Sequence, residues 1–193
     1  MSTDYVLAGY RVAPRYVREE WQDSSLPEGE LVSMSGCVVD VLYTDPHEWD
    51  DWFGSPGAAE RARVQSGRSG SHVLGVGFAV PDVPEVTADI TDSGSEAAAG
   101  TLLERLARRE PAADGEPLGF ELVGYECGLW HTWTCIGGLV REVYDATGVR
   151  PGEWGLVQDE QDARRAAAWL TESGAGEPKV FYWVAAKLVD VPV

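Results

Sequence analysis

Apolar side chains recur at helical spacing in two segments of the last third of the chain. The first segment, residues 132–146, carries an apolar stripe at i, i+3, i+4 and i+7 formed by Ile136, Leu139, Val140 and Val143. Gly148 follows it as a helix stop. The second segment, 160–171, repeats the spacing in Ala163, Ala166, Ala167 and Leu170, after Asp159 as a favourable N-cap. The small alanines predict a helix that lies flat against a sheet.

Two further helices are predicted nearer the N-terminus. Residues 94–109 carry a stripe of Ala99, Leu102, Leu103 and Leu106. Ser93 and Glu96 have the spacing of a capping box at its start. A shorter helix over 56–65 is indicated by Ser55 as cap and Pro56 at the first helical position.

Runs of β-branched and aromatic residues, bounded by turn residues, predict strands at 72–80, 118–125 and 179–189. The segment YVLAGYRVA near the N-terminus is a fourth candidate, and 31–43 reads as either a strand pair or a buried helix. Segments 111–117 and 172–178 have the composition of loops.

Strands and helices mix without regular β–α–β alternation, which favours an α+β fold over a parallel α/β fold. We predict a single domain over residues 1–193, with a mixed, mainly antiparallel sheet packed by three or four helices. Residues 71–193 form the better-defined part, and residues 1–70 form an acidic N-terminal portion.

The charge of the chain restricts its partners. Thirty-two acidic against fifteen basic residues give a net charge of −17. Such a charge repels nucleic acid, whose phosphates require clusters of Lys and Arg, and favours a basic protein partner. The alternative is that the acidity serves solubility alone. The sequence does not indicate the oligomeric state.

The chain is predicted to be cytoplasmic. Its first sixteen residues lack the basic region and apolar run of a signal peptide, and no window approaches the roughly 20 apolar residues of a membrane span. Three cysteines, an odd number, argue against a disulfide framework.

One acidic stretch is the leading candidate for a binding surface. From Glu19 to Glu60 the chain has eleven acids and no Lys or Arg. Trp21, Trp49, Trp52 and Phe53 in this stretch are candidate apolar anchors within a charged rim. The partner-binding residues predicted in the segment DPHEWDDWFG are Asp45, Glu48, Trp49, Asp50, Asp51 and Trp52. The alternatives are a solvated acidic loop and a helical turn whose two tryptophans pack inward.

Cys127, His131 and Cys135 are spaced four apart and would share one face of a continuous helix. With a fourth ligand such as Cys37 or Glu126 they would form a tetrahedral zinc site, and a Cys–His pair is also suited to nucleophilic catalysis. Cys127, however, ends a predicted strand, so we expect the three side chains to be separate, and we predict no cofactor. Gly75 and Gly77 lack the third glycine of a dinucleotide fingerprint, and they indicate close packing against a neighbour.

Residues 118–190 resemble a loosely defined group of small bacterial proteins, some of which look like immunity partners of secreted polymorphic toxins. The resemblance lies in the segments LGFELVGYECGLWHTW, GLVQDEQDARRAAAWL and KVFYWVAAKLVDV. It implies no catalytic residues.

These observations give three hypotheses. The first is a non-enzymatic acidic binding protein, in the form of an immunity-type inhibitor of a basic toxin or nuclease. The second is a small enzyme or zinc protein that uses the corner of Cys127, His131 and Cys135. The third is a structural or scaffold protein whose acidity serves solubility.

Overall fold

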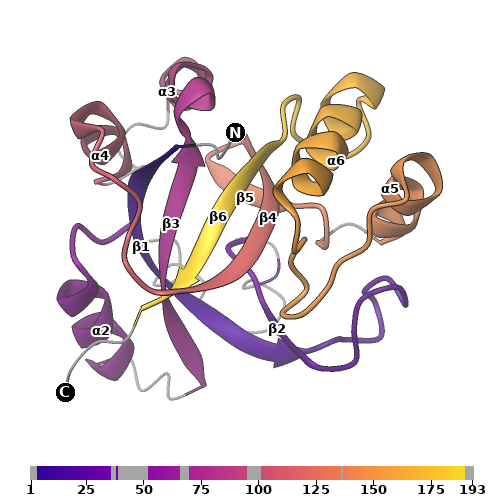
Figure 1. Ribbon diagram of the computed structural model, residues 1–193, viewed down its shortest axis with the longest axis horizontal. Coiled ribbons are helices and arrows are strands. Elements are labelled where there is room, and N and C mark those ends of the chain that lie inside the picture. Colours follow the sequence, from indigo (N-terminus) through magenta and orange to yellow (C-terminus); the bar gives the residue numbers. More distant parts are fainter. Residues whose placement is uncertain are drawn as a thin grey trace.

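The computed structural model describes residues 4–35, 38, 52–65, 70–94, 101–135 and 137–189. Its centre is a curled six-stranded sheet in the order β2-β1-β3-β6-β4-β5, in which every neighbouring pair is antiparallel (Figure 1). The strands are β1 (Tyr5–Val17), β2 (Glu30–Val32), β3 (Ser71–Ala79), β4 (Glu116–Glu126), β5 (Leu129–Thr132) and β6 (Tyr182–Leu188). The predicted α+β class with an antiparallel sheet is confirmed.

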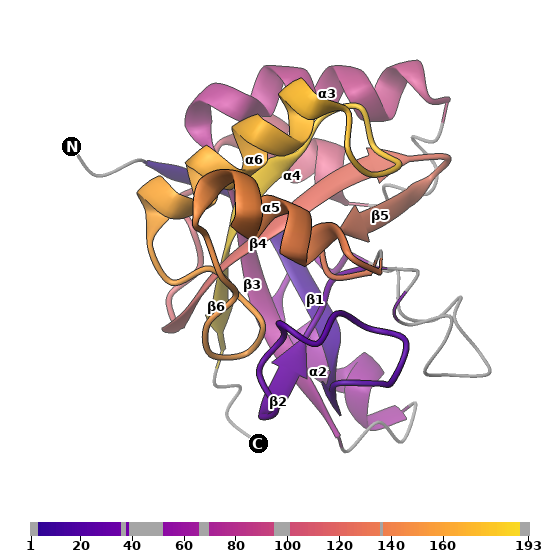
Figure 2. The same cartoon turned by 90° about the vertical axis from the view of Figure 1, so that its right-hand side faces the viewer.

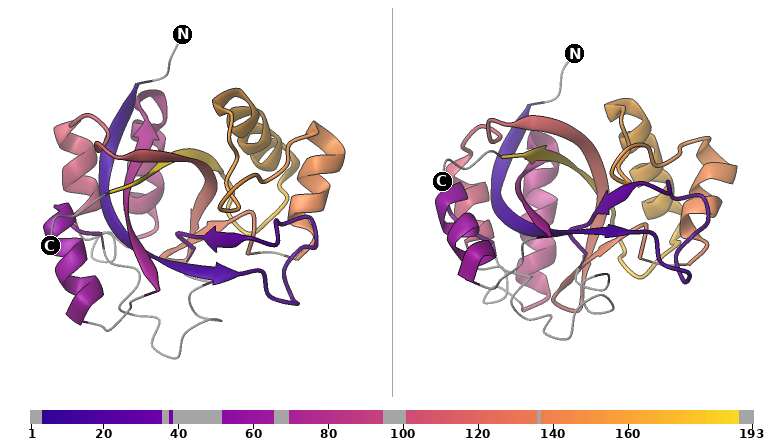
Figure 3. Two further views of the ribbon diagram at one scale, coloured as in Figure 1. Left: turned by 60° about the horizontal axis from the view of Figure 1, so that its bottom comes forward. Right: turned by 90° about the horizontal axis from the view of Figure 1, so that it is seen from below.

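Five helices within the described residues accompany the sheet: α2 (Pro56–Gln65), α3 (Val83–Asp92), α4 (Leu102–Arg108), α5 (Leu139–Thr147) and α6 (Glu160–Ser173). Helices α2 and α4 contact β1 on one side of the molecule, and α6 contacts β4 and β6 on the opposite side, where α5 packs against it (Figures 1 and 3). Among the described residues, none of the helices combines the length and apolar character that crossing a membrane requires.

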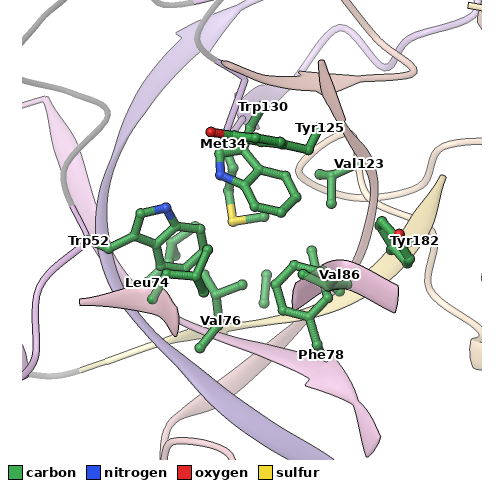
Figure 4. Packing of buried hydrophobic residues seen from close by; sticks show 14 of the residues in the cluster. Met34, Trp52, Leu74, Val76, Phe78, Val86, Val123, Tyr125, Trp130 and Tyr182 are labelled. Atoms are coloured by element: carbon green, nitrogen blue, oxygen red, sulfur yellow. The ribbon is translucent and has the colours of Figure 1, made fainter. Parts of the chain in front are cut away.

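The main core fills the space inside the curl of the sheet. Phe78 of β3, Val123 and Tyr125 of β4, and Trp130 of β5 point into this space together with Trp52 (Figure 4). A second core lies between the other face of β4 and helices α5 and α6, and it contains Leu122, Trp133 and Phe181. Alternation along β4 assigns successive residues to the two cores.

The loop that precedes α6 connects β2, an edge strand, to the part of β4 that β5 does not cover. Leu31 of β2 forms a parallel bridge with Trp154, and Phe120 of β4 forms an antiparallel bridge with Val157. Both backbone groups of Phe120 bond to Val157, at 2.8 and 2.9 Å. The N-terminal portion is therefore an integral part of the sheet, with β1 between β2 and β3.

Several predicted elements are confirmed with small shifts. Helix α6 begins after Asp159, whose side chain accepts hydrogen bonds from the backbone of Gln161 and Asp162. Helix α5 ends at Gly148, which has a φ of 75°. In β3, a Cβ at Gly75 would lie 2.5 Å from Cβ of Ala113, so the close packing expected at this glycine is confirmed.

The predicted helix at 132–146 begins too early. Residues 129–132 form β5, which returns along β4 through a two-residue hairpin at Cys127 and Gly128. Both turn residues have positive φ, at 53° and 86°, as the favoured hairpin turns require. Pairing with β4 outweighs the helical spacing in this segment, and the helix starts at Leu139.

The predicted capping box joins Ser93 to Glu96, which lies outside the described residues. Ser93 ends α3, and its hydroxyl donates a hydrogen bond to the carbonyl of Ile90 at 2.6 Å. Helix α3 was not predicted, because Pro81 precedes it and Pro84 lies within its sequence. Pro84 lies in its first turn, where a missing N–H costs no helical hydrogen bond. Its apolar stripe of Val83, Val86 and Ile90 is buried.

Candidate functional site: an anchored acidic loop beside helix α5

Trp52 is the described member of the predicted partner-binding residues, and it is buried. Its side chain is 5% exposed, its ring centroid lies 6.0 Å from that of Trp130, and the Arg11 guanidinium lies 5.0 Å from its ring. The inward-packing alternative therefore holds for Trp52, which cannot present its ring to a partner in this structure. The other predicted residues, Asp45, Glu48, Trp49, Asp50 and Asp51, lie outside the described residues.

The described part of the acidic stretch places a different tryptophan on the surface. Residues 18–29, called here the acidic loop, join β1 to β2. Trp21 in this loop is 38% exposed. Glu19, Glu20 and Glu28 of the same loop are also exposed. In Figure 2 this loop lies below α5. The loop thus combines one accessible indole with exposed carboxylates.

Polar contacts hold the acidic loop in place. The carboxylate of Asp23 accepts a hydrogen bond from the backbone N–H of Ser25 at 2.8 Å and another from that of Arg141, in α5, at 3.1 Å. The Arg18 guanidinium donates to the carbonyl of Ser24 at 2.7 Å. Leu26 is 3% exposed within the second core. The loop is therefore ordered before any partner arrives, which lowers the entropic cost of binding.

Asp23 remains a carboxylate despite its burial. Burial acts to raise the pKa of Asp23, but the hydrogen bonds from Ser25 and Arg141 outweigh it, and the net pKa lies below the ordinary value. The negative charge also lies at the N-terminal end of α5, where the helix dipole favours an anion. The anchor of the loop is thus an ionised group.

A cleft of about 510 Å³ separates the acidic loop from helix α5. Its lining includes Ser25 of the loop, Arg141 and Tyr144 of α5, and Arg150, which follows the helix. The Arg150 guanidinium lies 4.1 Å from the Tyr144 ring centroid and donates a hydrogen bond to its hydroxyl. The two side chains therefore hold each other in place where they line the cleft.

A second cleft, of about 320 Å³, lies at the other end of the loop. It is lined by Pro27, Gly29 and Glu30 from one segment and by Glu153 and Trp154 from another. Helix α5 also exposes Glu142 and Asp145. Sequence reasoning missed both clefts, because their walls come from segments more than one hundred residues apart.

Ion pairs within the chain account for many of its cations. Among the described residues, ion pairs within 4 Å join carboxylates to Arg15, Arg63, Arg105, Arg108, Arg164 and Arg165. Each pair contributes little to stability where it is exposed, but it cancels the positive charge locally. The field around the molecule therefore comes mainly from the excess carboxylates, such as Glu19, Glu20 and Glu28.

Cys127, His131 and Cys135 are not brought together. Cys127 is exposed in the β4–β5 hairpin, where it lines a cleft of about 390 Å³ with Asp89, Asp92 and Lys179. His131 is buried in β5, with Nδ1 at 2.9 Å from a carboxylate oxygen of Glu177. Cys135 is half-buried in the turn that follows β5. Cys37 lies outside the described residues, and within them no group of three or more His, Cys, Asp or Glu side chains is placed to hold a metal ion.

One buried carboxylate lies inside the curled sheet. Glu121 of β4 is 2% exposed and accepts hydrogen bonds from the Ser33 hydroxyl at 3.0 Å and from the backbone N–H of Met34 at 3.0 and 3.3 Å. Burial raises the pKa of Glu121 to about 7, although these hydrogen bonds and the charge of Arg11 act to lower it.

Glu121 thereby fastens the segment that follows β2 to strand β4, across the curl of the sheet. Its contacts give it a role in holding the fold. Sequence reasoning could not select this residue, because among thirty-two acids no carboxylate is distinguished by its type alone.

Within the described residues, the acidic loop and the two clefts beside it are the candidate binding surface. It offers an accessible indole, exposed carboxylates and a rigid support, which are the components of a protein-binding surface. Comparison with protein-family models, with curated proteins and with solved structures finds no match to this chain.

Proposed function

We propose that this chain is a non-enzymatic acidic binding protein whose acidic loop captures a basic protein. The observation that carries the proposal is the exposure of Trp21 beside Glu19 and Glu20 on a loop that the buried carboxylate of Asp23 holds in place. An immunity-type inhibitor of a basic toxin or nuclease is the specific form that we propose. The resemblance of residues 118–190 to immunity partners supports that form.

Three physical effects make this surface suitable for a basic partner. The net charge of −17 attracts a basic protein over long range and speeds its association. After encounter, an aromatic anchor within a polar rim supplies affinity by excluding water around it. Because the loop is already ordered, little conformational entropy is lost on binding.

The proposal also fits a partner that acts on nucleic acid. A protein that binds phosphates needs a basic surface, and exposed carboxylates can occupy that surface in place of the phosphates. The acidic protein would then block its partner without any chemistry of its own.

The test compares two variants of equal charge change. One replaces Glu19, Glu20 and Glu28 of the acidic loop with Gln. The control replaces Glu85, Asp92 and Asp114, which are exposed elsewhere, with Gln or Asn. A partner is first identified by affinity capture, starting with the products of neighbouring genes, and association rates are then measured at low and high salt.

The loop variant should associate about tenfold or more slowly at low salt, and the wild type should lose this advantage as salt rises. The control should retain most of its rate, because its charges lie away from the interface. A third variant, with Asp45, Glu48, Asp50 and Asp51 replaced by Asn or Gln, tests the remainder of the acidic stretch. Equal rates for loop and control variants, with no salt dependence, would leave solubility as the role of the acidic charge.

A further inference from the structure

The cleft between Pro27 and Trp154 combines an aromatic wall with carboxylates. Its volume of about 320 Å³ lies at the lower end of the range for ligand pockets, roughly 300–1,000 Å³. A cleft of this size accommodates a single side chain of a partner. Glu30 and Glu153 line it together with Trp154.

The wall formed by Trp154 is held on several sides. Its carbonyl accepts a hydrogen bond from the backbone N–H of Val32 at 3.1 Å, and its ring meets that of His72 edge-on, with 5.7 Å between centroids. The side-chain amide of Gln158 donates to the carbonyl of Glu153 at 3.1 Å and to that of Leu118, in β4, at 3.2 Å. The indole of Trp154 and the backbone of Glu153 are therefore held by contacts with the sheet and with Gln158.

The two carboxylates of the cleft differ in whether another residue of the chain pairs with them. Glu30 forms an ion pair with Arg15 of the neighbouring strand, which shows that this carboxylate accepts a guanidinium. Glu153 is exposed, and no ion pair joins it to another described residue. Glu153 is thus the group of the cleft that is available to a cation from outside.

An indole beside a carboxylate favours a cation that is both flat and rich in N–H donors. A guanidinium stacks on an aromatic ring and donates two parallel hydrogen bonds to a carboxylate, whereas an ammonium acts as a compact, strongly hydrated charge. The Arg150 guanidinium over the Tyr144 ring shows the same kind of stacking elsewhere in the chain. The chemistry of the cleft therefore selects arginine over lysine.

We propose that the cleft between Pro27 and Trp154 receives an arginine side chain of the basic partner, stacked on Trp154 and bonded to Glu153. The identity of the occupant as part of a basic protein rests on the proposed function. The selectivity for a guanidinium rests on the cleft alone, so the two can be tested separately.

The experiment uses the full chain and three small probes, the N-acetyl amides of arginine, lysine and citrulline. Citrulline has nearly the shape of arginine without its charge. Binding is followed by NMR at the indole N–H of Trp154, which is assigned with the Trp154→Phe variant. The variant Glu153→Gln removes the carboxylate, and Glu142→Gln, an exposed glutamate of α5 that does not line the cleft, is the matched control.

The arginine probe should shift the Trp154 signal in a saturable way, more tightly than the lysine probe, and the citrulline probe should not. Glu153→Gln should weaken the arginine response about fivefold or more, and Glu142→Gln should leave it unchanged. An equal response to citrulline, or an unchanged response in Glu153→Gln, overturns the proposal. If the arginine probe fails while neutralising the acidic loop still slows the partner, the cleft proposal is wrong and the proposed function stands.

Discussion

The carboxylate of Asp23 accepts a hydrogen bond from the backbone N–H of Arg141, 118 residues later in the chain. Helix α5 begins after Gly138, which has no side chain to cap it, so the acidic loop supplies the cap instead. The helix and the loop therefore stabilise each other.

Replacing Asp23 with Ala should lower the free energy of unfolding by about 1–2 kcal/mol, because both the cap and the turn to Ser25 are lost. Urea denaturation measures the loss. Asp23→Asn, which keeps an acceptor oxygen, should lose less. If Asp23→Ala is as stable as the wild type, the loop is not anchored in this way.

Glu121 should make stability depend on pH. Its pKa is about 7 in the folded chain against an ordinary value of 4.5, so between these values the folded chain keeps a proton that the unfolded chain has lost. The contribution of Glu121 to stability is therefore fully present below pH 4.5, and it falls as pH rises through 7, by an amount on the order of 3 kcal/mol.

Glu121→Gln should remove this dependence, because the amide stays neutral and keeps an acceptor for Met34. Unfolding free energies between pH 4 and 8 test it, with Glu116→Gln, an exposed position of the same strand, as control. The same pH profile in wild type and Glu121→Gln would falsify the prediction.

Gly124 in β4 allows the chain around Pro178 to approach the sheet. A Cβ at this position would lie 2.3 Å from Cβ of Pro178 and 2.6 Å from the carbonyl oxygen of Val180. Gly124→Ala should therefore destabilise the protein by about 1–3 kcal/mol through overpacking, as a thermal melt would show. Gly70→Ala is the control, since a Cβ there meets nothing within 4 Å, and equal melting temperatures for the two variants would contradict the prediction.

Leu139 begins α5 and is 3% exposed in the second core. Leu139→Ala should cost about 2–5 kcal/mol, because it leaves a cavity in the core that also contains Trp133 and Phe181. Val64→Ala, at a position 62% exposed, should change stability little in the same denaturation experiment. A small effect at Leu139 would show that this end of the helix is not part of the core.

Cys127, His131 and Cys135 should not bind zinc together, because they lie in a hairpin turn, a strand and a later turn. Elemental analysis of protein purified without added metal should find less than stoichiometric zinc. One zinc per chain, lost on Cys135→Ser, would restore the alternative of a zinc protein or enzyme.

The sequence determined the features that depend on neighbours along the chain. Helix α2 and the cap of α6 at Asp159 follow from local hydrogen bonding and allowed backbone angles. The buried stripe of α6 follows from helical periodicity. The central residues of strands β3, β4 and β6 follow from their β-branched and aromatic composition. These signals are local, so the fold class could be predicted without knowing which elements touch.

Tertiary structure alone decided which residues face the solvent and which distant groups meet. Trp21 and Trp52 lie in the same acidic stretch, yet one is 38% exposed and the other 5%. The difference arises because Trp52 packs against Trp130 and Arg11, from distant strands, whereas Trp21 lies in a loop outside the sheet. The pairing of Asp23 with Arg141, and of Glu121 with Met34, likewise depends on how the sheet curls, because no local pattern records contacts across more than eighty residues.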